Sequence, residues 1–289
     1  MTTLEQFLTR AEAMLTRLEA LLPEKTATVL DWNSPTAAFR WRKKNGRGVL
    51  TPIAHISPIS LPDLFFVERQ KALLEQNTRQ FLQGKPANNV LLTGARGTGK
   101  SSLVRACLNA FSKEGLRLIE VDKDDLVDLD EISDLVARRP ERFILYCDDL
   151  SFDEGDSSYK ALKVALDGSV AAQSENILIY ATSNRRHLLP EKMSDNTGYA
   201  HDENGDLHPS ETVEEKISFS DRFGLWLSFY PYSQEEYLFI TAHWLRFFGC
   251  SEDQIAQARE EALQWALHRG SRSGRTAWQF ARDYAGRVL

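Results

Sequence analysis

The stretch at residues 89–102 constrains the fold more than any other part of the chain. It reads Asn-Val-Leu-Leu-Thr-Gly-Ala-Arg-Gly-Thr-Gly-Lys-Ser-Ser and contains the pattern Gly-x-x-x-x-Gly-Lys-Ser. An apolar run at 90–92 precedes the glycines, and a helical run at 103–108 follows them. A buried strand, a glycine-rich loop and a helix in this order form a phosphate-binding loop. We therefore expect an α/β protein that binds a nucleotide.

The residue types in this loop suit a polyphosphate. Glycine adopts the backbone that turns successive N–H groups inward, and the helix that follows adds the positive end of its dipole. We expect Lys100 to reach the β and γ phosphates and Ser101 to hold Mg²⁺ between them. The loop residues expected to bind ATP are Gly94, Ala95, Arg96, Gly97, Thr98, Gly99, Lys100, Ser101 and Ser102.

Strand and helix signals alternate from residue 64 onward. Helical patterns separate the first four of five short apolar runs, which is typical of a parallel sheet with helices on both faces. Ligands of such sheets bind beyond the carboxyl ends of the strands, where the glycine-rich loop lies. The apolar runs are residues 90–92, 116–121, 143–147, 177–182 and 225–230.

The flanking regions have different patterns. Apolar residues recur in steps of four and three over 3–23, which predicts an amphipathic helix that docks on its own domain or binds a partner or a second copy. Residues 24–63 contain four prolines without sustained periodicity, which predicts an irregular connector with short extended pieces. After Pro231 the chain is helical, with capping-box patterns at Ser233 and Ser251. The expected domains are an appendage at 1–63, an α/β core at 64–232 and a helical lid at 233–289.

The connector holds the densest basic run of the chain, Arg-Trp-Arg-Lys-Lys-Asn-Gly-Arg at residues 40–47. Two interpretations are open: a solvated hairpin with an Asn-Gly turn, or a contact with a polyanion or an acidic partner.

Hydrolysis requires further groups beyond the loop. Residues 142–150 form an apolar run that ends in two carboxylates. We expect Asp148 to orient Mg²⁺ and Asp149 to polarise the attacking water. Asn184 ends the next apolar run, where an amide can hold that water against the γ phosphate.

Two arginines complete the expected site. Arg222 stands just before the fifth apolar run, and it could neutralise transition-state charge on a neighbouring subunit's nucleotide. Arg275 begins the last helical run and could report the γ phosphate to the lid, with Arg272 as an alternative.

The order of these motifs resembles that of the AAA+ ATPase superfamily over residues 64–289. Walker A, Walker B, sensor 1, arginine finger and sensor 2 correspond to 94–101, 143–149, Asn184, Arg222 and Arg275. Phrases such as Ala-Thr-Ser-Asn-Arg-Arg-His-Leu resemble an uncharacterised bacterial family of AAA+ ATPases of unknown function. The resemblance implies a five-stranded sheet ordered 5-1-4-3-2, a small helical lid, ATP with Mg²⁺, and oligomers with shared sites.

One departure from that pattern concerns turnover. Most of the superfamily has Asp-Glu in Walker B, whereas the second acid here is Asp149, whose side chain is shorter by one C–C bond of about 1.5 Å. Slow hydrolysis is therefore expected. Glu154 is either a substitute base or a solvated loop acid.

A long polar segment at 187–218 separates sensor 1 from the finger. Residues 202–206 read Asp-Glu-Asn-Gly-Asp, which predicts a hairpin with an Asn-Gly turn. Because loops of this length in compact domains are mobile or functional, we expect it to contact a partner or a neighbouring subunit.

Composition limits the class of partner. The 289 residues carry a net charge of −6, so the chain lacks the overall basic field of a nucleic-acid binder. Three scattered cysteines give no zinc pattern, and no apolar run approaches the ~20 residues of a membrane span. We expect a cytoplasmic protein with no membrane span.

We therefore predict a Mg-dependent ATPase that forms homo-oligomers and remodels a macromolecular partner, with a protein partner favoured over DNA. The alternative is a slowly hydrolysing, ATP-gated switch or loader. The guanine signature Asn-Lys-x-Asp and the Leu-Ser-Gly-Gly-Gln segment of ABC transporter ATPases are both absent from the sequence. A small-molecule kinase is a minor alternative, because it needs neither the finger nor the lid arginine.

Overall fold

The computed structural model describes residues 36–44, 46–152, 156–167, 174–185, 188, 200–201, 207–208 and 221–289, together with Met14. The chain divides into two units, Met1–Pro35 and Thr36–Leu289, and the fold described below is that of the second. The amphipathic helix expected at 3–23 lies outside the described residues except for Met14, which is helical. Glu154 and most of the segment 187–218 also lie outside them.

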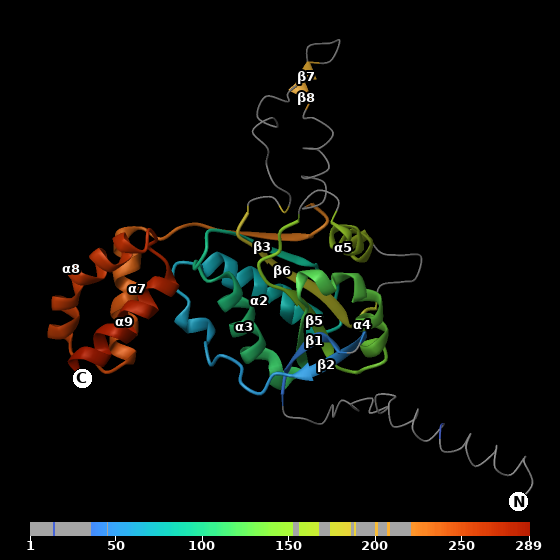
Figure 1. The fold of residues 1–289 in the computed structure, drawn as a ribbon, viewed down its shortest axis with the longest axis horizontal. Coiled ribbons are helices and arrows are strands. Elements are labelled where there is room, and N and C mark those ends of the chain that lie inside the picture. The colour runs from blue at the N-terminus through green and yellow to red at the C-terminus, as the bar shows by residue number, and fades with distance from the viewer. Residues whose placement is uncertain are drawn as a thin grey trace, which may run out of the picture. The chain divides into compact units, whose positions relative to one another are not determined.

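A mixed sheet forms the centre of the second unit. Its strand order is β2-β1-β4-β5-β6-β3-β9 (Figure 1). All neighbours pair in parallel except β1 and β2, which are antiparallel. The strands are β1 (Ala38–Lys44), β2 (Arg47–Pro52), β3 (Val90–Gly94), β4 (Leu116–Glu120), β5 (Arg142–Cys147), β6 (Ile177–Ser183) and β9 (Leu225–Phe229).

The expectation of a five-stranded, wholly parallel sheet is wrong, because this sheet has seven strands and one antiparallel pair. The five strands expected from the apolar runs occupy consecutive places from β9 to β4, and the β1–β2 hairpin extends the sheet beyond β4.

Residues 38–52 of the connector expected at 24–63 are more regular than the short extended pieces predicted there. These residues form the hairpin, which turns at Gly46 with a φ of 74°. Residues Phe39 and Trp41 alternate with arginines along β1 and are buried, and β1 pairs with β4 in the register Arg40↔Glu120. The hairpin interpretation of the basic run is confirmed, but the hairpin is built into the sheet rather than solvated.

Helices cover both faces of the sheet, with α2 and α3 on one side and α4 and α5 on the other (Figure 1). Val90 and Leu92 of β3 are buried in the cluster that holds α2 and α3, and Leu91 between them is also fully buried. Alternate side chains of a strand point to opposite faces, so both faces of β3 are covered. These helices are α2 (Glu68–Leu82), α3 (Lys100–Phe111), α4 (Leu129–Val136) and α5 (Ser157–Asp167). The 3-10 turns are η1 (Leu61–Asp63), η2 (Ser112–Glu114) and η3 (Lys123–Asp128).

Three helices, α7 (Gln234–Phe247), α8 (Glu252–His268) and α9 (Gly274–Val288), form the helical part after β9. The capping boxes are confirmed: the hydroxyls of Ser233 and Ser251 accept from the backbone N–H groups three residues on. The three helices pack around a small buried cluster that includes Tyr237, Ala262 and Phe280.

The strands β7 (Ala200–His201) and β8 (Leu207–His208) form a separate antiparallel pair. They flank the hairpin turn expected at 202–206, and the turn residues themselves lie outside the described residues.

Candidate functional site

The glycine-rich loop connects the carboxyl end of β3 to the start of α3. Gly94, Gly97 and Gly99 have φ values of 134°, 75° and 100°, a region that other residues rarely adopt. A Cβ on Gly94 would lie 2.0 Å from the carbonyl oxygen of Phe229, and one on Gly97 would lie 2.6 Å from the Ser273 hydroxyl oxygen. Both backbone conformation and close packing therefore require glycine in this loop.

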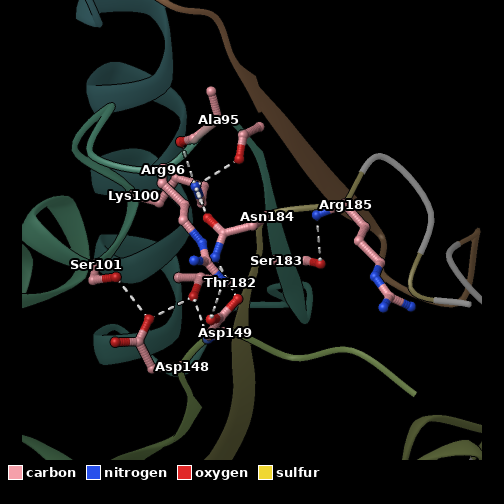
Figure 2. Close-up of polar contacts among 11 residues, drawn as sticks. Ala95, Arg96, Lys100, Ser101, Asp148, Asp149, Thr182, Ser183, Asn184 and Arg185 are labelled. Atoms are coloured by element: carbon pink, nitrogen blue, oxygen red, sulfur yellow. Dashed lines mark hydrogen bonds and ion pairs between the residues drawn. The ribbon is translucent and has the colours of Figure 1, made fainter. Parts of the chain in front are cut away.

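Lys100 lies at the centre of the loop with only 5% of its surface exposed. Its Nζ donates to the carbonyl oxygens of Gly94 and Ala95, at 2.7 and 2.8 Å, and to Oδ1 of Asn184 at 3.0 Å (Figure 2). Burial lowers the pKa of this ammonium to about 8. A buried cation that the loop encircles is well placed to bind a phosphate anion.

The remaining loop residues shape this cradle. The Thr98 hydroxyl donates to the Ala95 carbonyl oxygen at 2.8 Å, while Ser102 is half-buried in the first turn of α3. The Arg96 side chain runs from the loop toward Asp149 and is 77% exposed (Figure 2). Arg96 therefore lies at the open side of the cradle.

The Asp148 carboxylate accepts hydrogen bonds from three hydroxyl groups. Its Oδ1 accepts from Ser101 and Thr182, each at 2.6 Å, and from the Tyr146 hydroxyl at 2.8 Å. Burial opposes ionisation of Asp148, but these hydrogen bonds, led by the one from Ser101, outweigh it and hold its pKa below the usual range. The Arg105 guanidinium lies 3.9 Å from Oδ2.

The pair formed by Ser101 and Asp148 fits a magnesium ion. A charged carboxylate and a hydroxyl in direct contact are hard oxygen donors, which Mg²⁺ prefers, and one or two such protein groups suffice when phosphates and water supply the rest. The structure thus brings together the two residues expected to hold the metal.

Asp149 and Asn184 also meet. Asn184 Nδ2 donates to Asp149 Oδ1, and Arg96 lies 3.6 Å from Asp149 Oδ2 (Figure 2). Asp149 has a φ of 53°, which is uncommon for a residue other than glycine, and its N–H donates to Thr182 Oγ1 at 2.9 Å. This strand end is therefore held in one unusual conformation by its neighbours.

Two residues of this cluster, Thr182 and Tyr146, are not among the site residues predicted from the sequence. Thr182 bridges the two acids, because its hydroxyl donates to Asp148 and accepts from the N–H of Asp149. Both residues lie within apolar strands. The hydroxyl group that each carries in an otherwise apolar run is the only signal in the sequence that could have identified them.

The lid reaches the loop through its backbone. The N–H of Gly274 donates to the Gly97 carbonyl oxygen at 2.9 Å, and the Tyr232 hydroxyl donates to the Thr98 carbonyl oxygen at 3.0 Å. Arg275 follows directly, and its charge contributes to the lowered pKa of Lys100. Arg272 is exposed and precedes the helix. The geometry places Arg275 beside the site, and its role there stays a prediction.

Arg222 does not join this cluster. It precedes β9, whose first residue pairs with the first residue of β3, whereas the loop follows the last residue of β3. The five residues of β9 span about 16 Å at the usual strand rise. Arg222 instead forms an ion pair with Asp167 at the end of α5.

Comparisons with known proteins agree with this geometry. The chain matches, over residues 34–288, the family described as "Protein of unknown function (DUF815)". No curated protein matches the sequence. None of the helices in the described part of the chain is long and apolar enough to cross a membrane.

Similar solved structures are AAA+ proteins. The RuvB Holliday junction branch migration motor of Thermotoga maritima has a TM-score of 0.50 and 19% identity, with 78% of this chain and 64% of that chain covered. A variant of the same RuvB gives a TM-score of 0.51 at 18% identity and the same coverage. The AAA domain of FIGL-1, in complex with ADP, gives 0.50 at 18% identity, with 80% of this chain and 74% of that chain covered. The chain spans less than two thirds of the RuvB chains, and at these identities the likeness is one of fold.

Proposed function

The chain belongs to the DUF815 family of proteins of unknown function and has an AAA+ fold, and from this premise we propose that it is a Mg-dependent ATPase. In this proposal it hydrolyses ATP to ADP and phosphate and couples the cycle to motion of the helical lid and remodelling of a macromolecular partner. Its site is completed by a second copy of the chain.

One observation carries the proposal: the carboxyl ends of β3, β5 and β6 bring the loop, the acids and the amide into one hydrogen-bonded cluster. Lys100 contacts Asn184, Asn184 contacts Asp149, and Ser101 contacts Asp148. These side chains come from three separate segments of the chain. A glycine-rich turn with a purely structural role needs none of these contacts.

The chain's own residues supply the binding. The loop N–H groups and the start of α3 attract the phosphates, and Lys100 adds a charge-assisted hydrogen bond. Ser101 and Asp148 would hold Mg²⁺, which neutralises charge on the β and γ phosphates.

For hydrolysis, a water oxygen forms a bond to the γ phosphorus while the bond to the ADP oxygen breaks. Asp149 polarises this water and accepts its proton, and Asn184 orients it. The present contact between the two side chains uses one carboxylate oxygen of Asp149 and the amide nitrogen of Asn184, which leaves the second oxygen of Asp149 to face a water molecule.

Arg222 acts on a neighbouring subunit in this proposal. Arg222 lies at the amino end of the sheet. It therefore cannot stabilise a γ phosphate bound at the carboxyl end of the same sheet. A second copy that presents Arg222 to the loop would complete the site and make activity depend on assembly.

A protein partner is favoured over DNA. Two cations of the basic run are engaged within the chain: Arg40 pairs with Glu120 at 2.6 Å and Lys43 with Asp128 at 3.0 Å. Salt-sensitive DNA binding that is lost when Arg40, Arg42, Lys43 and Lys44 are neutralised would reverse this preference.

The test is steady-state phosphate release from Mg·ATP, measured per protomer across a wide range of protein concentration. We expect the rate to rise with concentration as sites are completed between subunits. A constant rate that persists at high dilution would exclude a site shared between subunits, and release of a phosphorylated small molecule would indicate a kinase.

A second candidate function is an ATP-gated switch or loader that hydrolyses ATP slowly. The specific observation that favours it is Asp149, which is shorter than glutamate and is held by Asn184 and Arg96. Tight ATP binding with negligible phosphate release at every protein concentration would favour this function over the ATPase.

A further inference from the structure

A cavity of about 260 Å³ lies beside the candidate nucleotide site, over β1, β4 and β5. Its floor is apolar and includes Ala38, Leu108 and Leu118, all of which are buried. Ile53 and Ile56, which pack against the core, add to its apolar lining. The nucleotide function described above does not use this space.

The segment at residues 53–59, which supplies part of this lining, is held at both ends. At one end, the N–H of Ile53 donates to the Ala38 carbonyl oxygen at 2.9 Å, and the Thr36 hydroxyl donates to the Ile53 carbonyl oxygen at 2.8 Å. At the other end, Asn109 Nδ2 on α3 donates to the carbonyl oxygens of Ser57 and Ile59, both at 2.8 Å. This side of the cavity is therefore fixed between two hydrogen-bonded points, which makes the space a built feature of the fold.

The polar lining carries two arginines with different partners. Arg40 donates from Nε and Nη2 to one oxygen of Glu120, at 3.0 and 2.6 Å, and this pairing raises its pKa. Arg105 has a weaker ion pair: it lies 3.9 Å from Asp148, and 44% of its side chain is exposed. The cation that is best able to accept a new anion is therefore Arg105.

Two lining residues contact the carboxylate expected to hold Mg²⁺. Arg105 approaches Oδ2 of Asp148, and the buried Tyr146 hydroxyl donates to Oδ1. The Arg105 guanidinium and a bound Mg²⁺ would compete for the Asp148 carboxylate. When Mg²⁺ takes Asp148, Arg105 becomes available to an anion in the cavity.

We propose that this cavity binds a small amphipathic carboxylate, with its apolar body on the aliphatic floor and its carboxylate on Arg105, and that binding is coupled to Mg·ATP through Asp148. The coupling rests on the proposed function, whereas the binding itself rests on the cavity. The carboxylate belongs to a free aliphatic acid or to the carboxyl terminus of a peptide that ends in an aliphatic residue. At about 260 Å³, the cavity is smaller than drug-sized pockets of ~300–1,000 Å³, which suits one such group.

The effect is reciprocal, because linkage requires two ligands to change each other's affinity by the same factor. Mg·ATP tightens binding of the carboxylate, and the carboxylate tightens binding of Mg·ATP. Such couplings are usually of about 5- to 150-fold. Binding of the carboxylate in the cavity would thus change the affinity of the nucleotide site for Mg·ATP.

The experiment is calorimetric titration of the full chain with 4-methylpentanoate, with and without Mg²⁺ and a non-hydrolysable ATP analogue. The neutral 4-methylpentanamide is the matched probe without charge, and Gly-Gly-Leu with its amide represents a peptide terminus. We expect the acid to bind at least tenfold more tightly than its amide, and at least fivefold more tightly when Mg·analogue is bound.

Variants assign the effect to the cavity. Arg105→Gln should remove the preference for acid over amide, and Ile56→Trp should fill the cavity and abolish binding of both. Lys113→Gln removes an exposed charge outside the cavity and should change neither. Tighter binding of Gly-Gly-Leu than of the free acid would identify a peptide terminus as the source.

Three results would overturn the inference: equal affinity for acid and amide, no binding of either acid while the analogue is bound, or an unchanged acid preference in Arg105→Gln. The analogue is titrated separately in the same protein. If the analogue fails to bind but the acid still binds through Arg105, the proposed nucleotide function is wrong and the cavity stands.

Discussion

The two ends of the central sheet differ in whether the predicted site residues there contact one another. At the carboxyl end, Lys100, Asp149 and Asn184 touch one another within a single chain. At the amino end, Arg222 stands apart from that cluster and is paired with Asp167. The difference shows that one chain brings together the residues of the predicted nucleotide site, whereas Arg222 takes part in a separate ion pair. If the proposed function holds, Arg222 acts on the nucleotide of a second copy.

The strongest test of this comparison is Arg222→Ala. Loss of a finger in trans should lower the ATP turnover of the assembled protein by about 1,000-fold, because such arginines contribute roughly 10³–10⁵. ATP affinity, measured by calorimetry, should stay within about twofold. Arg138→Ala replaces an exposed arginine that follows α4 and serves as the matched control.

Mixing variants tests the same point independently. Arg222→Ala and Lys100→Ala subunits each lack one half of a shared site, so their mixture should recover part of the activity that neither has alone. No recovery, together with equal loss of turnover at every concentration, would place Arg222 in a structural role.

The second prediction concerns the acid at the carboxyl end. Asp149→Asn keeps the shape of the side chain but removes its charge, so turnover should fall a few hundred-fold, within the usual range for loss of a general base, roughly 10²–10⁴. Nucleotide affinity should change little. If phosphate release is unaffected, another group is the base, and the switch function would need a different explanation for slow turnover.

The third prediction separates binding from hydrolysis. Lys100→Ala removes the buried ammonium, and ATP affinity measured by calorimetry should fall by about 100-fold, which corresponds to the ~1.5–3 kcal/mol typical of a hydrogen bond to a charged group. Lys113→Ala is the control, since that lysine is exposed on η2. Unchanged affinity in Lys100→Ala would contradict a phosphate-binding role for the loop.

The smallest expected effect is a dependence of affinity on pH. Burial lowers the pKa of Lys100 to about 8, and a bound phosphate favours the charged form and raises it. Nearly full affinity should therefore be present below about pH 7 and should weaken several-fold between about pH 7 and pH 9 as the free protein loses this proton. Lys100→Arg keeps the charge over this range and should remove the dependence; a slope that persists in this variant would assign it to another group.

Much of the candidate site was predictable from the sequence because its residues occur in local patterns. The glycine spacing and the terminal lysine and serine identify the loop, and Asp148 and Asn184 each end an apolar run. In a parallel sheet, strand ends of this kind meet at one edge, so chain order alone implied their proximity. Thr182 escaped prediction because its partners lie on a neighbouring strand.

The pairing of the β1–β2 hairpin with the central sheet shows why part of the fold was missed. Its pairing partner β4 is far along the chain, as the register Arg40↔Glu120 shows. The ring of Trp41 lies over Gly48, where an added Cβ would come within 1.7 Å of a ring carbon. The indole also donates to Asp128 at 3.0 Å. The local sequence pattern of this proline-containing stretch does not predict these contacts.

The sequence by itself therefore predicted the type of fold and most of the residues that the structure brings together at the candidate site, because both depend on short-range patterns of backbone conformation and polarity. Only the tertiary structure decided that the sheet gains a hairpin beside β4, that Thr182 joins the two acids, and that a cavity with Arg105 adjoins Asp148. Those features arise from contacts between segments distant in sequence, and the energy of such contacts depends on packing that no local pattern encodes.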